Sequence, residues 1–570
     1  MKFRLIAALL VSCSFAAGAK LKDTPKPPTP KPAVAAEPAT GVEAAIPSPI
    51  KALGEPAMMD FPGDIQMAVT AATEKAQAHV NQGLNHLHSG WEFEASRHFA
   101  AAMREDPECL LAHWGMLMSM LTPSPETDAA RMVVTTRMLD LVDQGKGSEL
   151  ERSYAYALIK YLDEGPARAA NAFRWAAEKF PNDLQAGIFA ALFSRGGYDE
   201  FGTATPDQQA AEQSLLAMIA KNPQSPLPLN ALLTIRAEAP DLSDSLDLAR
   251  KLCEIVPNYP PYLRLLGHYQ WRCGHHKAAA ATFERTSSAL ERWMKDNKTS
   301  VADCPEWVNS ESYRIVALTS QGDMELALPS ARKLAAIPFP KNRAFSPGAR
   351  AVLWEAKTLP ARVLIYRGQQ GDAAEALNSL PKPEESKNTR DKSLAYWWID
   401  GLRLNTEGRR LIDEGKLSEA REVAAAISHH SEEMQKQQNN AAANGERSLW
   451  NPSFIALDIL GRDLHGRIEL ANPKNGVGTA YNWFAGAADL QHPAIMMSPP
   501  VVLTPMTARL GDYYLTTNRP KDAIEAYDRA LTAFPNDMSA LLGLKTAYER
   551  ADLSDEAAQT ARKIADLHAQ

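Results

Sequence analysis

Two stretches at opposite ends of the 570-residue chain carry the same ladder of small, aromatic and proline residues. The first runs through Gly83, Gly90, Ala95, Phe99, Ala102 and Pro107, and the second through Gly511, Ala523, Tyr527, Ala530 and Pro535. Small residues let two antiparallel helices approach closely, an aromatic ring fills the remaining gap, and proline ends the second helix. The ladder therefore predicts helical hairpins that stack on one another.

Partial copies of the ladder lie between these two stretches. They include Ala169-Phe173-Ala176-Pro181, Gly267-Ala279-Phe283, Gly322-Ala327-Ala331, Gly408-Ala420-Ala424, and Gly461 with Ala480 and Phe484 across a lengthened loop. A last unit from Ala547 to Ile564 fits a C-terminal cap. No stretch shows the alternating, glycine-bounded pattern of β-strands. These copies predict an all-α chain of roughly nine to ten hairpins.

The ladder resembles the 34-residue tetratricopeptide repeat (TPR). Segments at both ends are also similar to a group of exported bacterial TPR proteins: Asn81–Asn85, Ala112-His113-Trp114-Gly115, Ser498-Pro499-Pro500 and Leu510–Leu515. The resemblance implies a TPR-type right-handed superhelical solenoid of antiparallel helix pairs. It implies no particular reaction.

The N-terminus is typical of a secretory signal. Lys2 and Arg4 precede an apolar stretch, and Ala17-Gly18-Ala19 forms a small-residue cleavage site, which predicts a signal peptide over 1–19. The sequence Leu10-Val11-Ser12-Cys13 also resembles the lipobox of bacterial lipoproteins, so lipidation of Cys13 is an open alternative. We expect an exported protein of the periplasm or extracellular space, with outer-membrane anchoring if Cys13 is the processed residue.

The segment after the signal is rich in proline. Proline fixes φ and removes the amide donor, so we expect a disordered, extended linker over 20–60. Beyond it, the repeats divide into N-terminal repeats over 61–300, degenerate middle repeats over 301–435, a polar insertion over 436–453, and C-terminal repeats with a cap over 454–570.

Composition excludes two classes of partner. The chain has 61 basic and 68 acidic residues and a net charge of −7, whereas nucleic-acid binding usually needs a clustered positive field. Apart from the signal, no apolar run is long enough for a transmembrane span. We therefore expect neither nucleic acid nor a membrane-spanning segment.

In a TPR superhelix, the first helix of each hairpin lines the concave face. Residues three or four apart share one stripe of that helix. Counting along the repeats predicts a ligand-binding groove lined by Tyr154, Tyr161, Arg264, His268, Trp271, Asn405 and Arg409. A cation, an imidazole and an indole on one stripe suit a peptide or a carboxylate-bearing ligand.

Histidine and cysteine gather at two places. Cys273-Gly274-His275-His276 lies at a predicted helix turn, and His86, His88, His98 and His113 fall around the first repeat. Metal sites need three or four converging ligands, whereas histidines near helix turns are mostly solvated or packed. We expect no metal and no cofactor. Cys253 ends one predicted helix and Cys273 lies at the far end of the next, roughly 18 Å from the near end of that helix, which is too far for a disulfide.

The sequence holds no G-x-S-x-G elbow, phosphate-binding glycine loop or H-E-x-x-H motif. The expected function is a non-catalytic scaffold that binds a protein or peptide in the bacterial cell envelope. Two alternatives remain open: an envelope enzyme or metal-handling factor that uses the histidine clusters, and a lipoprotein of outer-membrane assembly or transport.

Overall fold

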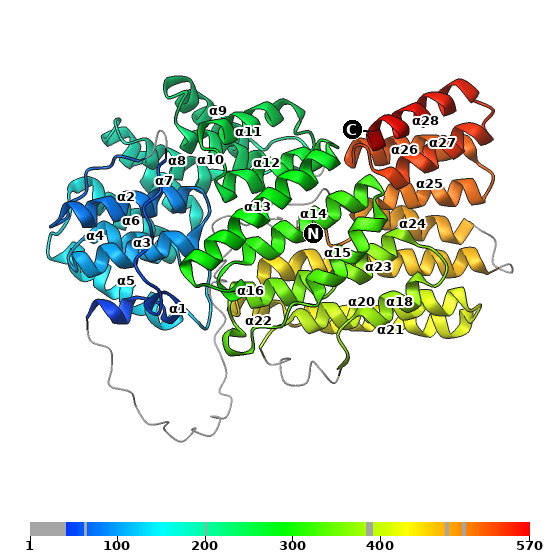
Figure 1. The fold of residues 1–570 in the computed structure, drawn as a ribbon, viewed down its shortest axis with the longest axis horizontal. Helices are drawn as coiled ribbons and strands as arrows, with labels where there is room; N and C mark the ends of the chain where they lie inside the picture. The colour runs from blue at the N-terminus through cyan, green and yellow to red at the C-terminus, as the bar shows by residue number, and fades with distance from the viewer. Residues whose placement is uncertain are drawn as a thin grey trace, which may run out of the picture. The chain divides into compact units, whose positions relative to one another are not determined.

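A computed structural model describes residues 41–61, 65–199, 202–383, 392–472, 478–492 and 498–569. The chain forms two compact units (Figure 1). Unit 1 runs to Gly196 and also includes Pro206–Ala231, and unit 2 comprises Gly197–Thr205 and Leu232 onward. The predicted subdivisions at 300 and 435 do not coincide with this division. The predicted signal peptide, Cys13 and residues 20–40 lie outside the described residues.

Unit 1 is helical throughout. Its elements are the short η1 (Val42–Ala45) and α1 (Ser48–Lys51), then α2 (Glu74–His88), α3 (Glu92–Glu105), α4 (Leu110–Met118), α5 (Asp128–Asp143), α6 (Glu149–Glu164), α7 (Pro166–Lys179), α8 (Leu184–Ser194) and α9 (Pro206–Lys221). Helix α10 (Pro226–Arg236) begins in unit 1 and ends in unit 2.

Unit 2 contains the remaining elements. These are α11 (Ser243–Ile255), α12 (Pro260–Arg272), α13 (His276–Asn297), η2 (Val301–Asp303), α14 (Pro305–Gln321), α15 (Met324–Ala335), η3 (Lys341–Arg343), α16 (Pro347–Ala351), the π-helical η4 (Val352–Ala356), α17 (Leu359–Arg367), α18 (Asp372–Ser379), α20 (Ala395–Asp413), α21 (Leu417–Gln435), α22 (Gln438–Ala443), α23 (Arg447–Ala471), α24 (Gly478–Leu490), α25 (Met506–Thr516), α26 (Pro520–Ala533), α27 (Met538–Arg550) and α28 (Ser554–Ala569). Within the described residues, the β-structure is limited to one isolated bridge between Tyr198 and Ala204.

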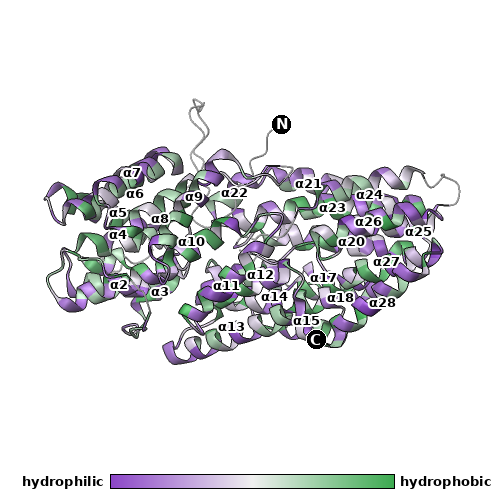
Figure 2. Cartoon of the chain, turned by 90° about the horizontal axis from the view of Figure 1, so that it is seen from above, coloured by the Kyte–Doolittle hydropathy of each residue, from purple (hydrophilic) through white to green (hydrophobic). Residues whose placement is uncertain are grey.

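Consecutive helices pack as hairpins. The pairs are α2–α3, α4–α5, α6–α7, α8–α9, α12–α13, α14–α15, α17–α18, α20–α21, α23–α24, α25–α26 and α27–α28. The sequence ladder did not identify the α4–α5 and α17–α18 pairs. Most helices carry both hydrophilic and hydrophobic residues (Figure 2), as expected for helices buried on one side. The all-α, TPR-type architecture predicted from the sequence is confirmed.

The glycine–aromatic spacing in the ladder reflects direct contact between helices. A Cβ on Gly83 would lie 2.7 Å from the Phe99 ring, and a Cβ on Gly115 in α4 would lie 2.2 Å from it. Tyr527 is held in the same way between Gly511 and Gly543. Each aromatic ring thus fills a space that exists only because the facing helices carry no side chain there.

One predicted register is wrong. The sequence pairs Gly461 with Phe484, whereas the ring of Phe484 packs against Gly466, where a Cβ would lie 2.7 Å away. A Cβ on Gly461 would instead meet Ile427 at 3.5 Å. Helix α23 runs as far as Ala471, so the glycine that faces the aromatic ring lies further along the helix than the ladder suggested.

The prediction of a disordered linker over 20–60 is wrong for residues 41–60. Ile46 and Ile50 are buried, Glu43 pairs with Arg104 at 2.8 Å, and the Gly54 carbonyl accepts a hydrogen bond from Arg97 at 3.3 Å. The proline-rich composition gave no sign of these contacts, because their partners lie far along the chain.

The predicted polar insertion over 436–453 is largely helical. It forms α22 and the first turns of α23, and the carboxylate of Glu446 between them accepts hydrogen bonds from Trp354, Ser393 and the backbone N–H of Leu394. Among the described helices, none combines the length and the apolar character that crossing a bilayer requires.

Candidate functional site

A non-helical segment of unit 1 lies along α2. We call residues 55–72 strap 1; residues 55–61 and 65–72 of it are described. The backbone N–H of Ile65 donates to Asn85 Oδ1 at 3.2 Å, and that of Val69 donates to Gln77 Oε1 at 2.7 Å. Gln77 and Asn85 are eight residues, or about 12 Å, apart on the helix. The strap runs antiparallel to α2 here, and four residues of an extended chain span a distance of this size.

Two glutamines of α2 each contact both polar groups of the strap backbone. Gln82 Oε1 accepts from the N–H of Met59 at 3.2 Å, and its Nε2 donates to the Met59 carbonyl at 2.6 Å. Gln77 accepts from Val69 and donates to the Met67 carbonyl at 2.7 Å. A primary amide offers one acceptor and two donors, so it satisfies an extended backbone much as a neighbouring β-strand would.

Other elements of unit 1 complete the hold on strap 1. The N–H of Thr70 donates to Glu151 Oε1 and that of Ala72 donates to Asp106 Oδ2, both at 2.7 Å. The side chains of Phe61, Ile65 and Met67 are buried. The strap is therefore held through its backbone by polar side chains and through alternate side chains by apolar packing.

An open pocket of about 510 Å³ adjoins strap 1 within unit 1. Residues 65–68 of the strap form one side, and the other sides come from Leu150, the turn Lys179–Asp183, Gln185 and the start of α10 at Ser225 and Leu227. Polar and apolar groups both face this space, so it can accept a side chain of either kind.

Unit 2 holds a second such segment between α24 and α25. We call residues 498–505 strap 2. Tyr313 of α14 donates to the Ser498 carbonyl at 2.9 Å, and Arg362 of α17 donates to the carbonyls of Val501, at 2.9 Å, and Pro500. Ser498, Val502, Leu503 and Thr504 are buried. This strap includes the Ser498-Pro499-Pro500 motif on which the resemblance to exported TPR proteins partly rests.

Arg362 is itself buried and paired. Its Nη1 lies 2.9 Å from Glu355 Oε2, and both side chains are almost fully enclosed. Burial raises the pKa of Glu355, and the guanidinium of Arg362 opposes that rise. Arg362 therefore satisfies a buried carboxylate and two strap carbonyls at once.

All seven residues predicted to line a groove are buried. Tyr154 donates to Asp183 at 2.6 Å, Tyr161 packs on Phe193, Trp271 donates to Ser320 at 3.2 Å, and His268 bonds the Ala237 carbonyl at 3.1 Å. Arg264, Asn405 and Arg409 are enclosed as well. The prediction that these side chains face a ligand is wrong, because neighbouring repeats cover them.

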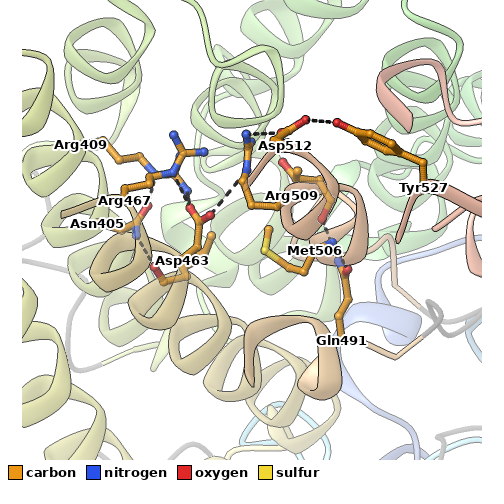
Figure 3. A network of polar contacts seen from close by, with 11 residues as sticks. Asn405, Arg409, Asp463, Arg467, Gln491, Met506, Arg509, Asp512 and Tyr527 are labelled. Atoms are coloured by element: carbon orange, nitrogen blue, oxygen red, sulfur yellow. Dashed lines mark hydrogen bonds and ion pairs between the residues drawn. The ribbon is translucent and has the colours of Figure 1, made fainter. Parts of the chain in front are cut away.

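Asn405 and Arg409 belong to a buried polar network in unit 2 (Figure 3). Asn405 donates to the Leu460 carbonyl at 2.9 Å, and Arg409 bonds both Asn405 Oδ1 and Asp463 Oδ2. Arg467 reaches the same carboxylate oxygen at 2.8 Å, and Arg509 lies 3.5 Å from Asp463 Oδ1. Burial alone would raise the pKa of Asp463, but the three guanidinium groups hold it well below its ordinary value.

The predicted stripe on α12 lies one layer beneath strap 2. The rings of His268 and Trp271 pack against Tyr313, with centroids 5.7 and 6.0 Å away, and Tyr313 in turn holds the strap. The residues that contact strap 1, above all Gln77, Gln82 and Asn85, were not singled out from the sequence. Their signal is a run of amide side chains on the first helix of the first repeat.

The structure brings together two of the four histidines noted around the first repeat. His86 and His98 stack at 5.2 Å, and one ligand atom from each of His86, Glu94 and His98 lies within 4.8 Å of the others. His88 instead bonds Gln185 at 3.1 Å, and His113 bonds the Cys109 carbonyl at 3.0 Å. Burial lowers the pKa of both His88 and His113 to about 4.

The second cluster, Cys273 to His276, packs within unit 2. The Gly274 carbonyl accepts a hydrogen bond from Asn536 at 3.2 Å, and His276 is buried, which lowers its pKa to about 4. Among the described residues, this turn does not bring three metal-ligand atoms together. Cys109, Cys253, Cys273 and Cys304 are all free thiols in the structure.

Neither a protein-family model nor a curated protein sequence matches the chain. Solved structures to which it is similar include the TPR domain of P58(IPK) (14% identity, covering 84% of this chain and 99% of that chain, TM-score 0.19). They also include yeast Tom70 (11%, 86% and 92%, TM-score 0.24) and the APC/C hetero-tetramer Cut9–Hcn1 (13%, 87% and 88%, TM-score 0.28). At these TM-scores the alignments carry no argument about binding, and the TPR-type fold rests on the packing described above.

Proposed function

We propose that the protein is a non-catalytic scaffold of the bacterial cell envelope that binds an extended segment of a partner protein at the surface of unit 1 that holds strap 1. The observation that carries this proposal is the hold on strap 1. Gln77 and Gln82 each contact an N–H and a carbonyl of an extended backbone. A surface that satisfies one extended chain in this way also suits another of similar shape.

In this proposal strap 1 occupies the binding surface in the structure, and the partner segment displaces it on binding. The pocket beside residues 65–68 is open while the strap is in place, so the incoming segment can bind there before it displaces the strap. The side chains described above as bonding to the backbone of strap 1 are neutral amides and two carboxylates, Asp106 and Glu151, that accept from N–H groups. We therefore expect the partner segment to be extended and free of proline at the positions that donate these bonds.

A complementation experiment tests whether the surface that holds strap 1 binds a separate peptide. Residues 55–72 would be replaced by a glycine–serine linker of equal length, and a fluorescein-labelled peptide with the native 55–72 sequence would be titrated in. We expect saturable binding that is lost when Gln77 and Gln82 are both changed to alanine. Failure of the peptide to bind the folded linker variant would contradict the proposal.

A second arm looks for the natural partner. The linker variant and its Gln77→Ala/Gln82→Ala derivative would be used as matched baits in envelope extracts, with the labelled strap peptide as competitor. A partner captured only by the first bait, and released by the peptide, supports the proposal. If neither the substitutions nor the peptide reduces capture, the partner binds at another surface and the proposal is contradicted.

The envelope location rests on the sequence of residues 1–19, and the alternative of a lipid anchor rests on Cys13. Mass spectrometry of the mature N-terminus distinguishes the two: cleavage after Ala19 leaves Lys20 as the first residue, whereas lipoprotein processing leaves an acylated Cys13.

A further inference from the structure

The strongest unassigned feature of unit 1 is a set of buried histidines between α2 and α3. His79 and His86 lie on α2, whereas Glu94 and His98 lie four residues apart on α3 and face them. His79, His86 and His98 have no exposed surface, and Glu94 is almost fully buried. Imidazole and carboxylate side chains enclosed together need either mutual hydrogen bonds or a cation.

The hydrogen bonds of this cluster fix the proton positions on two rings. Glu55 Oε1 lies 3.0 Å from His79 Nε2, and a carboxylate only accepts, so His79 donates from Nε2. With His79 neutral, its Nδ1 is then an acceptor, and it lies 3.1 Å from His98 Nδ1. His98 therefore carries its proton on Nδ1, which leaves a lone pair on Nε2.

That lone pair has no partner within the described part of the chain. His98 Nε2 is fully buried and forms no hydrogen bond. An acceptor left unsatisfied in the interior costs about 1–3 kcal/mol, so its retention needs a reason. The neighbouring Glu94 and His86 supply two further ligand atoms within 4.8 Å.

From this geometry we propose that His86, Glu94 and His98 bind a structural zinc ion. Two nitrogens and one carboxylate oxygen are ligands that zinc accepts, at about 2.0–2.2 Å, with an enclosed water to complete a tetrahedron. His79 and Glu55 form the outer shell, which orients the His98 ring as carboxylates orient zinc-bound histidines in many proteins. Glu94 Oε2 is 2.7 Å from Arg97 Nη1, so we assign the other carboxylate oxygen as the ligand atom.

Protonation favours this assignment. The hydrogen bonds through His79 leave His98 neutral, with a lone pair on Nε2, and neutral imidazole is the form that binds metals. The ion would join the two helices of the first hairpin. It would also bear on strap 1, because Glu55 belongs to the strap and the Phe61 ring packs edge-on against His86 at 5.2 Å.

The test uses the full chain, purified without a histidine tag, stripped with a chelator and dialysed against zinc sulfate. Bound metal would be measured by elemental analysis, and stability by thermal unfolding with and without zinc. We expect one zinc ion per chain and a higher melting temperature with the ion. Cobalt(II) in place of zinc should give the visible absorption of a four-coordinate site.

Variants separate ligand from outer-shell roles. His98→Gln removes a ligand and should abolish stoichiometric binding. Glu55→Gln, at a side chain that is 52% exposed, should fold normally and weaken zinc affinity by about 10–100-fold. His113→Gln is the matched control, because His113 is also buried with an unpartnered Nε2 but lies outside the three-ligand group.

If His98→Gln does not fold, Glu55→Gln still carries the test. Lys75→Gln provides its control, since it removes the other ion pair of Glu55 and leaves the bond to His79 in place. The proposal is overturned if the native chain neither binds zinc stoichiometrically nor gains stability from it. It is equally overturned if His113→Gln lowers the affinity as much as Glu55→Gln does.

Discussion

Strap 1 and strap 2 are both non-helical segments packed into helical units, but their backbones are held differently. Strap 1 is bonded through N–H groups as well as through the Met59 and Met67 carbonyls, whereas the contacts described for strap 2 all involve its carbonyls. In strap 1, the N–H groups of residues 59, 65, 69, 70 and 72 donate to amide and carboxylate side chains. In strap 2, a tyrosine and an arginine donate to the carbonyls of Ser498, Pro500 and Val501.

The difference follows from proline. Strap 2 contains Pro499, Pro500 and Pro505, which have no N–H, so only its carbonyls can be satisfied there, and only by donors. Strap 1 contains Pro56 and Pro62, but the five positions that donate carry ordinary residues with an N–H. The comparison teaches that unit 1 holds its strap largely through backbone donors, whereas unit 2 holds a proline-containing strap through backbone acceptors.

The largest effect that distinguishes the straps should come from Arg362→Met. It leaves Glu355 buried without its cationic partner and two strap carbonyls without a donor, which should cost about 3–5 kcal/mol. Native-state hydrogen exchange of α14 and α17 would measure the loss. The double variant Arg362→Met/Glu355→Gln should recover part of it, and no recovery would mean that the lost strap contacts, and not the unpaired charge, dominate.

For strap 1, the corresponding change is Val69→Pro. It removes the N–H that donates to Gln77 and leaves that amide oxygen unsatisfied, so we expect a loss of about 2–3 kcal/mol and faster proteolysis of the strap. Ala68→Pro is the matched control, because the N–H of Ala68 forms no hydrogen bond to any residue that the structure describes. Equal damage from both substitutions would show that proline conformation, and not the lost donor, is responsible.

One buried carboxyl of unit 2 should make its helix less stable as the pH rises, the opposite sign to the buried histidines, whose lowered pKa values cost stability as the pH falls. Asp537 caps α27 and accepts from Tyr366 at 3.1–3.2 Å, and burial raises its pKa to about 6. Because the folded state holds this proton more tightly than the unfolded state, stability is lost as the pH rises from the unfolded pKa toward the folded one. Asp537→Asn should abolish that loss, about 2 kcal/mol between about pH 4 and pH 7.5.

Hydrogen exchange of the α27 amides at the two pH values would measure this effect, with Asp537→Asn as the reference. An equal change in protection in the native chain and in Asp537→Asn would contradict it.

The smallest effect should come from Pro500→Ala in strap 2. The Pro500 carbonyl stays available to Arg362, so the main loss is the restriction that proline imposes on the unfolded chain, about 0.4–1 kcal/mol. Thermal unfolding would measure it. A loss as large as that of Val69→Pro would remove the contrast between the two straps.

The sequence predicted the helix pairs because their signal is local. Gly83 and Phe99, or Gly511 and Tyr527, are 16 residues apart, and the packing of one hairpin determines both. The straps could not be predicted in this way. Thr70 meets Glu151 81 residues away, and Arg362 meets Val501 139 residues away.

The residues predicted to line a groove are buried instead, for a related physical reason. Counting along a consensus repeat identifies positions on a helix face, but it does not say what later covers that face. His268 and Trp271 support Tyr313, which contacts strap 2, so the prediction found the correct side of α12 and missed the layer above it. In the histidine cluster, the sequence singled out His86 and His98. Glu94 and His79 could be added only once the structure showed how α2 and α3 face each other.

The central claim is that the surface of unit 1 that holds strap 1 binds an extended backbone, chiefly through its N–H groups. Hydrogen–deuterium exchange of the native chain, resolved to single amides in strap 1, tests it most directly. We expect the amides of Ile65, Val69, Thr70 and Ala72 to exchange much more slowly than that of Ala68. Exchange of all five at the rate of an unstructured peptide would contradict the account.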